Sequence, residues 1–180
     1  QEAERRGLPN ITNSADAVEA FVSEKTMRLF GRHNVLSRLE LQSRAEIRYE
    51  AYVKQINIEA RTMIDIASKQ IRPAVVKYAG TVARSLAAVQ AADGDTSVER
   101  ELLEEINVNL KLLHERLKML TEITEQASML KGDSKSQALF YRDYVFAAMN
   151  ELREPADRLE MLVDEGVWPF PTYGELLYNI

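Results

Sequence analysis

The stretch Leu-Glu-Glu-Ile-Asn-Val-Asn-Leu-Lys-Leu-Leu-His-Glu-Arg-Leu-Lys-Met-Leu, residues 103–120, decides the fold. Its apolar residues recur at alternating steps of three and four, the a/d pattern of helices that pack on one another. The pattern lasts three heptads and predicts a long third helix, which Gly132 ends. We expect the seam to fade at Thr124 and Ala127. Its members are Leu103, Ile106, Leu110, Leu113, Leu117 and Leu120.

Capping signals predict two helices before this seam. Asn13 or Ser14 can cap the first helix, and Gly31 is expected to end it as the residue after the last turn. Ser37 and Glu40 have the spacing of a capping box, which predicts that a second helix begins there.

The second helix is predicted to be the longest element. It continues to about Ala92, where Asp93-Gly94-Asp95 indicates a turn. Pro73 predicts a kink at that position or a break just before it, because proline lacks the amide donor and clashes with the preceding turn. The apolar stripe of this helix comprises Tyr49, Tyr52, Ile56, Ala60, Met63, Ala67, Ile71, Ala74 and Tyr78.

A fourth helix follows the seam with a matching stripe. It is predicted to begin near Asp133 or Ser134, to kink at Pro155 and to end at Gly166. The stripe comprises Ala138, Tyr141, Val145, Ala148, Leu152, Leu159 and Val163.

These elements predict an all-α fold. We expect a long antiparallel helical bundle with coiled-coil-like packing and proline-kinked helices, because the connections are short. Residues 1–12 are interpreted as a connector, 13–166 as the bundle domain and 167–180 as an aromatic tail. The second helix is longer than the others, so part of it should extend beyond the bundle and be available for docking.

Composition excludes several classes of function. The 180 residues carry a net charge of −5 with basic and acidic residues mixed, so we expect no nucleic-acid partner. The chain has no cysteine, which removes disulfides and thiolate sites and fits a reducing compartment. No apolar run approaches the roughly 20 residues that span a bilayer, so we expect no membrane insertion and a cytoplasmic location.

The C-terminal stretch Trp168-Pro-Phe-Pro-Thr-Tyr-Gly174 is aromatic and rich in proline. The prolines prevent a continuing helix, and the apolar side chains need a surface to pack against. Trp168 and Phe170 are expected to pack on the bundle, or the tail to pack on a domain outside this chain. Residues 178–180 are expected to be less ordered.

Candidate chemistry is sparse. His33 and His114 fall on different predicted elements without neighbouring ligands, so no metal site is predicted. Adjacent carboxylates such as Glu104 and Glu105 point in different directions on a helix and are interpreted as solvated charges. Residues 132–136 resemble a phosphate loop only faintly and are better explained as a helix cap. We therefore predict no catalytic, cofactor-binding or metal-binding residue.

Several stretches along the chain form a recognisable set, beginning with Glu2-Ala-Glu-Arg-Arg-Gly-Leu-Pro-Asn10, Val22-Ser-Glu-Lys25, Leu29-Phe30 and His33-Asn-Val-Leu36. The set continues through Arg48-Tyr-Glu50, Tyr52-Val-Lys-Gln-Ile-Asn-Ile-Glu-Ala60, Thr62-Met-Ile-Asp65 and Pro73-Ala-Val75, and ends with the tail motif at Trp168. In these stretches the sequence resembles the C-terminal region of type III glutamine synthetases, the large bacterial form.

The resemblance implies a parent enzyme that joins glutamate and ammonia at the expense of ATP, with Mg²⁺ or Mn²⁺ as cofactor. No catalytic motif of that family falls in this chain. The chain would therefore be a non-catalytic C-terminal domain with a structural or subunit-assembly role. Its implied partners are the catalytic domain of the same polypeptide, to which residues 1–12 would connect, and further subunits of a homo-oligomer.

Candidate docking residues lie in two segments. The first, at the densest part of the resemblance, is predicted to lie against the catalytic domain and comprises Tyr49, Tyr52, Gln55, Asn57 and Glu59. The second comprises the tail residues Trp168, Phe170 and Tyr173.

Two other functional hypotheses remain open at this point. The chain could be a free-standing helical adaptor that binds a partner protein through its long second helix or its tail. It could also be a small enzyme with a site between helices, which the scarcity of histidine and the lack of cysteine disfavour.

Overall fold

The predicted seam lies on α6 (Ser97–Met129), the longest helix of a computed structural model that describes residues 2–8, 10–171 and 177. Ile106, Leu113, Leu117 and Leu120 are buried, while Leu103 and Leu110 are half-buried. The buried stripe continues through Thr124 and Ala127, where the sequence led us to expect it to fade. Smaller residues therefore extend the seam by another turn or more without leucine.

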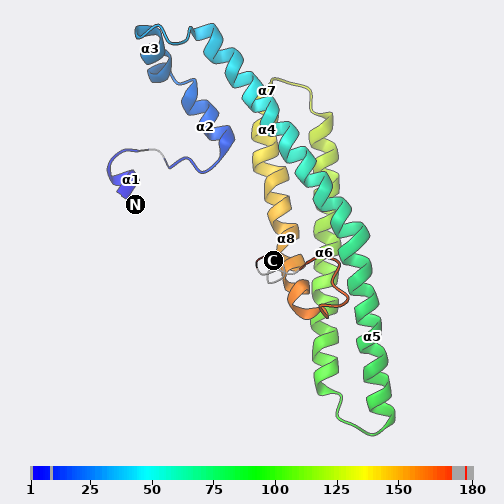
Figure 1. The fold of residues 1–180 in the computed structure, drawn as a ribbon. Coiled ribbons are helices and arrows are strands. Elements are labelled where there is room, and N and C mark those ends of the chain that lie inside the picture. The colour runs from blue at the N-terminus through cyan, green and yellow to red at the C-terminus, as the bar shows by residue number, and fades with distance from the viewer. Residues whose placement is uncertain (1, 9, 172–176, 178–180) are drawn as a thin grey trace. The chain divides into compact units, whose positions relative to one another are not determined.

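Figure 1 shows the described helices, and no strand occurs among the residues that the structure describes. The all-α class is thus confirmed. In chain order the elements are α1 (Glu2–Arg5), α2 (Ser14–Phe21), α3 (Glu24–Arg32), α4 (Arg38–Ile66), the π turn η1 (Ala67–Ile71), α5 (Arg72–Ala91), α6, α7 (Ser134–Phe140), the π turn η2 (Tyr141–Val145) and α8 (Phe146–Leu162).

The chain divides into two compact units, although the sequence suggested one bundle domain over residues 13–166. The first unit comprises Gln1–Glu59 and Gln126–Phe146, and the second comprises Ala60–Glu125 and Ala147–Ile180. Helices α4 and α6 contribute residues to both units.

In the first unit, the single helix predicted from residue 14 to Gly31 was wrong. The chain forms two helices instead, because Ser23 adopts an extended conformation and its hydroxyl accepts a hydrogen bond from the Thr26 amide at 3.3 Å. That contact caps α3 and ends the run of α2. Gly31 lies inside α3, and Asn34 takes the left-handed φ of 51° that ends a helix.

The capping box predicted for the second helix is present at the start of α4. The Glu40 carboxylate accepts hydrogen bonds from the Ser37 amide and hydroxyl, both at 2.7 Å, and the Ser37 hydroxyl accepts from the Glu40 amide at 3.3 Å. These contacts lower the pKa of Glu40, the backbone bond having the largest effect. The reciprocal pattern fixes where α4 begins.

In the second unit, the irregularity predicted at Pro73 is present as the π turn η1. Proline cannot donate to the carbonyl four residues earlier, here that of Lys69, and its ring needs extra space there. The wider turn over Ala67–Ile71 spans this carbonyl and precedes α5 directly. Asp93, with a φ of 55°, and Gly94, whose amide donates to the Val89 carbonyl at 3.0 Å, form the predicted turn after α5.

The stripe predicted for the fourth helix is buried along its whole length, at Ala138, Tyr141, Val145, Ala148, Leu152, Leu159 and Val163. The helix begins where predicted, since the Asp133 carboxylate accepts from the Ser136 amide at 2.8 Å and caps α7. The departure from α geometry lies at η2, which the sequence did not predict, whereas α8 continues through the buried Pro155.

The chain turns after α8, where the Asp164 carbonyl accepts from the Trp168 amide at 3.0 Å. Trp168 is buried and meets Phe170 edge to face, with ring centroids 6.2 Å apart. Both rings line a pocket of the second unit together with Ile71 and Ala156. Tyr173 and residues 178–180 lie outside the described residues.

Candidate functional site

The apolar inner face of α2 packs into the first unit. Ala15 and Val18 are buried together with Ala45, Tyr49 and Ala138, which come from α4 and α7. The partly buried Val22, Tyr52 and Val53 pack against this cluster. Polar contacts surround it.

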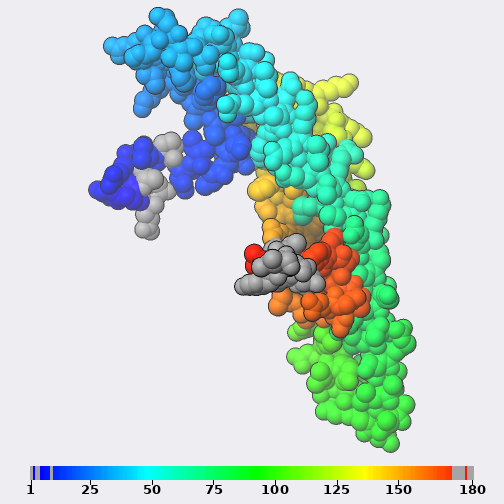
Figure 2. Space-filling view, viewed as in Figure 1, coloured from blue at the N-terminus to red at the C-terminus, as the bar shows by residue number. Residues whose placement is uncertain are grey.

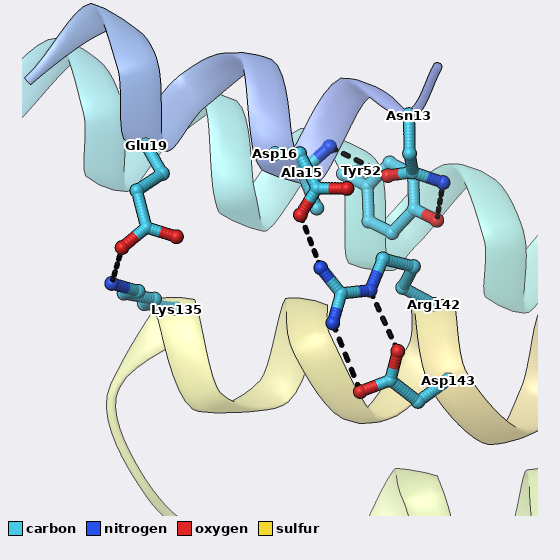
Figure 3. Close-up of polar contacts among 8 residues, drawn as sticks. All are labelled: Asn13, Ala15, Asp16, Glu19, Tyr52, Lys135, Arg142 and Asp143. Carbon is cyan, nitrogen blue, oxygen red and sulfur yellow. Dashed lines mark hydrogen bonds and ion pairs between the residues drawn. The ribbon is translucent and has the colours of Figure 1, made fainter. Parts of the chain in front are cut away.

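Asn13 performs two tasks at the start of α2. Its side-chain oxygen accepts a hydrogen bond from the Ala15 amide at 2.8 Å, which caps the helix. Its side-chain nitrogen donates to the Tyr52 hydroxyl at 3.2 Å, which ties the same cap to α4 (Figure 3). One residue thus fixes both where α2 begins and where it lies along α4.

Arg142, on η2, forms the second contact with α2. Its Nε and Nη2 donate to the two carboxylate oxygens of Asp143 at 2.7 and 3.0 Å, and its Nη1 donates to Asp16 (Figure 3). The fork is the planar geometry that suits arginine. The bond to Asp143, and then the charge of that carboxylate and of Asp16, raise the pKa of Arg142, and the guanidinium lowers the pKa of Asp143.

A third contact lies one turn further along α2. Lys135, in the first turn of α7, donates to the Glu19 carboxylate at 2.8 Å (Figure 3). This hydrogen bond lowers the pKa of Glu19 and raises the pKa of Lys135. Both groups are therefore charged over a wide pH range around neutrality.

These three contacts define what we name the α2 joint: Asn13–Tyr52, Asp16–Arg142 and Glu19–Lys135. The joint connects residues that are 39, 126 and 116 positions apart, so it links distant parts of the chain. Glu19 pairs with Lys135, and Arg142 is shared between Asp16 and Asp143. Such an arrangement holds elements in position and offers neither an activated nucleophile nor a proton relay.

The next helix is held near α4 by contacts of the same kind. Arg38 donates to Glu24 at 2.6 Å, and the Arg48 guanidinium lies over the Phe21 ring at 5.2 Å from its centroid. Phe21 in turn meets Phe30 edge to face at 6.1 Å. The N-terminal helices α2 and α3 are thus both attached to α4.

The docking residues predicted on the second helix have different environments. Tyr49 is buried in the core of the first unit, so its side chain is not at a surface. Tyr52 is half-buried and belongs to the α2 joint. Gln55 is exposed and donates to the half-buried Glu59 at 2.9 Å, and Asn57 is half-buried.

The predicted tail residues Trp168 and Phe170 belong to the second unit, where they line one pocket. Tyr173 lies outside the described residues. Whether either set docks on another domain stays a prediction.

Sequence reasoning missed the residues that make the α2 joint. Asp16 lies in the first turn of α2, and nothing in the local sequence pairs it with Arg142. Nothing in the local sequence pairs Glu19 with Lys135 either. Only the tertiary fold brings these residues together.

Two other classes of site find no support among the described residues. Among the described residues, no group of three or more His, Asp or Glu side chains is arranged to hold a metal ion. None of the described helices combines the length and the apolar character needed to cross a lipid bilayer.

Comparison with known families decides the relationship. A family model described as the glutamine synthetase C-terminal domain matches residues 1–90, which is half of the chain. The chain belongs to this family. The matched segment contains α2 and α4, whereas Lys135 and Arg142 of the α2 joint lie outside it.

Curated glutamine synthetases match this C-terminal domain over almost its whole length. The chain is 32% identical to a glutamine synthetase of Butyrivibrio fibrisolvens over 100% of its length, which is 26% of that relative. It is 32% identical to the type-3 glutamine synthetase of Dictyostelium discoideum over 98% of its length, and 28% identical to a glutamine synthetase of Bacteroides fragilis over 99%. The chain spans about a quarter of the length of these relatives.

Proposed function

We propose that this domain is a non-catalytic part of an ATP-dependent glutamate–ammonia ligase and serves a structural or subunit-assembly role. The family membership supports the parent activity, because the similar proteins are named glutamine synthetases. In this proposal the parent uses ATP with Mg²⁺ or Mn²⁺ at sites outside this chain, in the cytoplasm.

The observation that carries the structural role is the α2 joint. Three polar contacts attach the first well-formed helix to α4, α7 and η2, directly after the segment that we interpret as a connector. A connector joined to a firmly attached helix transmits the position of the preceding domain to the helical domain. A chain that only needed to be tethered would not require such contacts.

The proposed partners are the catalytic domain of the same polypeptide and further subunits of a homo-oligomer. Gln55, Asn57 and Glu59 on α4 are proposed to face the catalytic domain, with Tyr49 and Tyr52 supporting them from the core and the joint. Antiparallel, coiled-coil-like packing of the long helices is proposed as the scaffold, supported by the buried a/d seam of α6.

The test uses the full-length polypeptide that contains this chain. We expect the double substitution Lys135→Ala with Arg142→Ala to lower glutamine formation or to reduce the mass of the assembly, because it breaks two of three contacts of the joint. Arg153→Ala is the matched control, since Arg153 is exposed on α8 and bonds Asp157 on the same helix at 3.3 Å. Unchanged activity and unchanged mass in the double variant would overturn the structural role.

The isolated 180-residue chain provides a second measurement. We expect no glutamine formation from glutamate, ammonia, ATP and Mg²⁺, because the proposed catalytic residues lie elsewhere in the parent. Turnover by this chain alone would contradict the non-catalytic assignment.

A further inference from the structure

A pocket of about 260 Å³ lies in the second unit, where the chain turns after α8. Figure 2 shows part of the segment that follows α8, in orange-red, on the surface that faces the viewer. The volume is just below the range of about 300–1,000 Å³ that is typical of sites for drug-sized ligands, so the pocket suits a smaller group. The residues that line it are Ile71, Ala156, Asp157, Glu160, Trp168, Phe170 and Pro171.

Trp168 and Phe170 supply two aromatic rings to this pocket. The ring centroids are 6.2 Å apart and the ring planes meet at 75°, so the rings are steeply inclined rather than stacked. The face of an aromatic ring carries partial negative charge and attracts a cation that lies within about 6 Å of the ring centroid. Ile71 and Ala156 add apolar side chains. The pocket therefore combines an apolar lining with rings that favour positive charge.

The charged residues that line the pocket are acidic. Asp157 and Glu160 both belong to α8, and no Lys or Arg is among the described residues of the lining. Asp157 is exposed and accepts a hydrogen bond from Arg153 at 3.3 Å. Glu160 is half-buried, and its carboxylate has neither a hydrogen bond nor an ion pair within the part of the chain that the structure describes. One carboxylate of the pocket thus lacks a cation.

Two rings beside an unpaired carboxylate favour one class of ligand. An anion would be repelled by Glu160, and a neutral apolar group would shield the carboxylate from water without pairing it. A metal ion needs several protein ligands, and no group of three such side chains is arranged to hold one among the described residues. A guanidinium or ammonium group on a short aliphatic stem satisfies both the rings and the carboxylate. We propose that this pocket, which we name the tail pocket, binds such an organic cation.

A guanidinium suits the tail pocket better than an ammonium. It is planar and weakly hydrated, so it can stack on an aromatic ring and donate to a carboxylate at the same time. Contacts of this kind are individually weak at partly exposed sites, so we expect a dissociation constant on the order of 1 mM. The tail pocket lies in the second unit and the α2 joint in the first, so this binding does not depend on the structural role proposed above.

Nuclear magnetic resonance with two matched probes tests the proposal. Butylguanidinium and butylurea have the same shape, but only the first is charged. Trp168 is the only tryptophan of the chain, so its indole N–H gives a single resonance that reports on the tail pocket. Butylguanidinium should shift this resonance in a saturable way, and butylurea should bind at least about fivefold more weakly. Equal binding of the two probes overturns the proposal, and so does the absence of a shift with butylguanidinium.

A charge-removing variant identifies the carboxylate. Glu160→Gln keeps the size of the side chain and should weaken butylguanidinium binding about fivefold. Its melting temperature should stay unchanged, because the Glu160 carboxylate has no partner to lose among the described residues. Glu165→Gln is the matched control, since Glu165 is exposed after α8 and does not line the pocket. An equal loss of binding in both variants would mean that general surface charge attracts the probe, and would overturn the proposal.

The cation can come from an arginine or lysine side chain of the parent polypeptide or from a free guanidine or amine. Equilibrium dialysis of butylguanidinium against the full-length polypeptide distinguishes the two sources. Binding that Glu160→Gln weakens means that the tail pocket is open to a free ligand. Binding that Glu160→Gln leaves unchanged, after the isolated chain has shown the effect, means that a side chain of the parent already fills the pocket.

A ring-removing variant tests the aromatic part of the tail pocket. Phe170 is half-buried, and Phe170→Leu keeps an apolar side chain while removing the charged face of the ring. It should weaken the binding of butylguanidinium to the isolated chain and leave the binding of butylurea nearly unchanged. If both probes lose affinity equally, the ring contributes only packing, and the recognition of a cation by the aromatic side chains is overturned.

Discussion

Tyr49 carries a hydroxyl that is buried without a hydrogen-bond partner in the described part of the chain. The side chain is 4% exposed, and burial is the main cause that raises the pKa of this hydroxyl. Leaving such a group unpaired costs about 1–3 kcal/mol. Replacing it with Tyr49→Phe removes that cost and leaves a gap of only one oxygen atom, which costs about 0.4 kcal/mol.

We therefore expect Tyr49→Phe to raise the free energy of unfolding by about 1 kcal/mol. For a chain of this length that corresponds to a rise in melting temperature of about 2–4 °C. Tyr52→Phe is the matched comparison, because the Tyr52 hydroxyl accepts from Asn13 at 3.2 Å. Losing that bond should lower the free energy of unfolding by about 0.5–1.5 kcal/mol.

Urea unfolding followed by circular dichroism at 222 nm, which reports helix, measures both variants. The two tyrosines lie in the first unit, so both changes should appear in the same transition. If Tyr49→Phe destabilises the chain as much as Tyr52→Phe does, the Tyr49 hydroxyl has a partner, and the reasoning about its burial is refuted.

Three further predictions concern packing, a turn and pH. Leu120→Ala, at a fully buried position of α6, should lower the free energy of unfolding by about 2–5 kcal/mol in urea denaturation, and a loss below about 1 kcal/mol would contradict the buried seam. Gly94→Ala should lower the free energy of unfolding by about 1–3 kcal/mol, because the new Cβ would lie 2.7 Å from a Val89 methyl carbon. Gly132→Ala, with open space around it, should cost much less when both variants are compared by thermal melting. The lowered pKa of Glu19 stabilises the fold above the ordinary glutamate pKa of about 4.3, and this contribution is lost as the pH falls through the lower folded value. Glu19→Gln should thus lower the free energy of unfolding at pH 7 but leave it equal to that of the unsubstituted chain near pH 2. An equal loss of stability at both pH values would exclude the ion pair as the cause.

The sequence predicted the positions of the long helices well where one strong periodicity dominates. Ile106, Leu113 and Leu120 follow the heptad spacing and are buried as expected. A helix with a single apolar stripe packs with that stripe against the core, so the spacing alone predicts which residues are buried. The cap at Ser37 could be predicted equally well, since both partners of a capping box lie within one turn.

The break between α2 and α3 shows where local reasoning failed. The apolar spacing from Val18 to Leu29 is compatible with one helix, and the competing signal at Ser23 is a single hydroxyl that caps Thr26. The chain turns there, and the residues on both sides of the turn contact α4: Arg48 lies over the Phe21 ring, and Arg38 donates to Glu24. These contacts depend on residues far away in the sequence.

The candidate site was even less accessible to the sequence. Tyr49 was selected as a docking residue because it lies in a dense stretch of family resemblance, yet its side chain fills the core. A pattern along one helix shows which residues share a face, but not what the rest of the chain packs against that face. The pairing of Asp16 with Arg142 requires the tertiary fold for the same reason.

Trp168 is the only tryptophan of the chain, and it is buried in the second unit. Its fluorescence, excited at wavelengths that tyrosine does not absorb, is therefore an optical reporter of that unit alone, with no labelling required. Circular dichroism averages over the helices of both units. Agreement between the two signals during denaturation would mean that the units unfold together, and a separation between them would measure how independently each one melts.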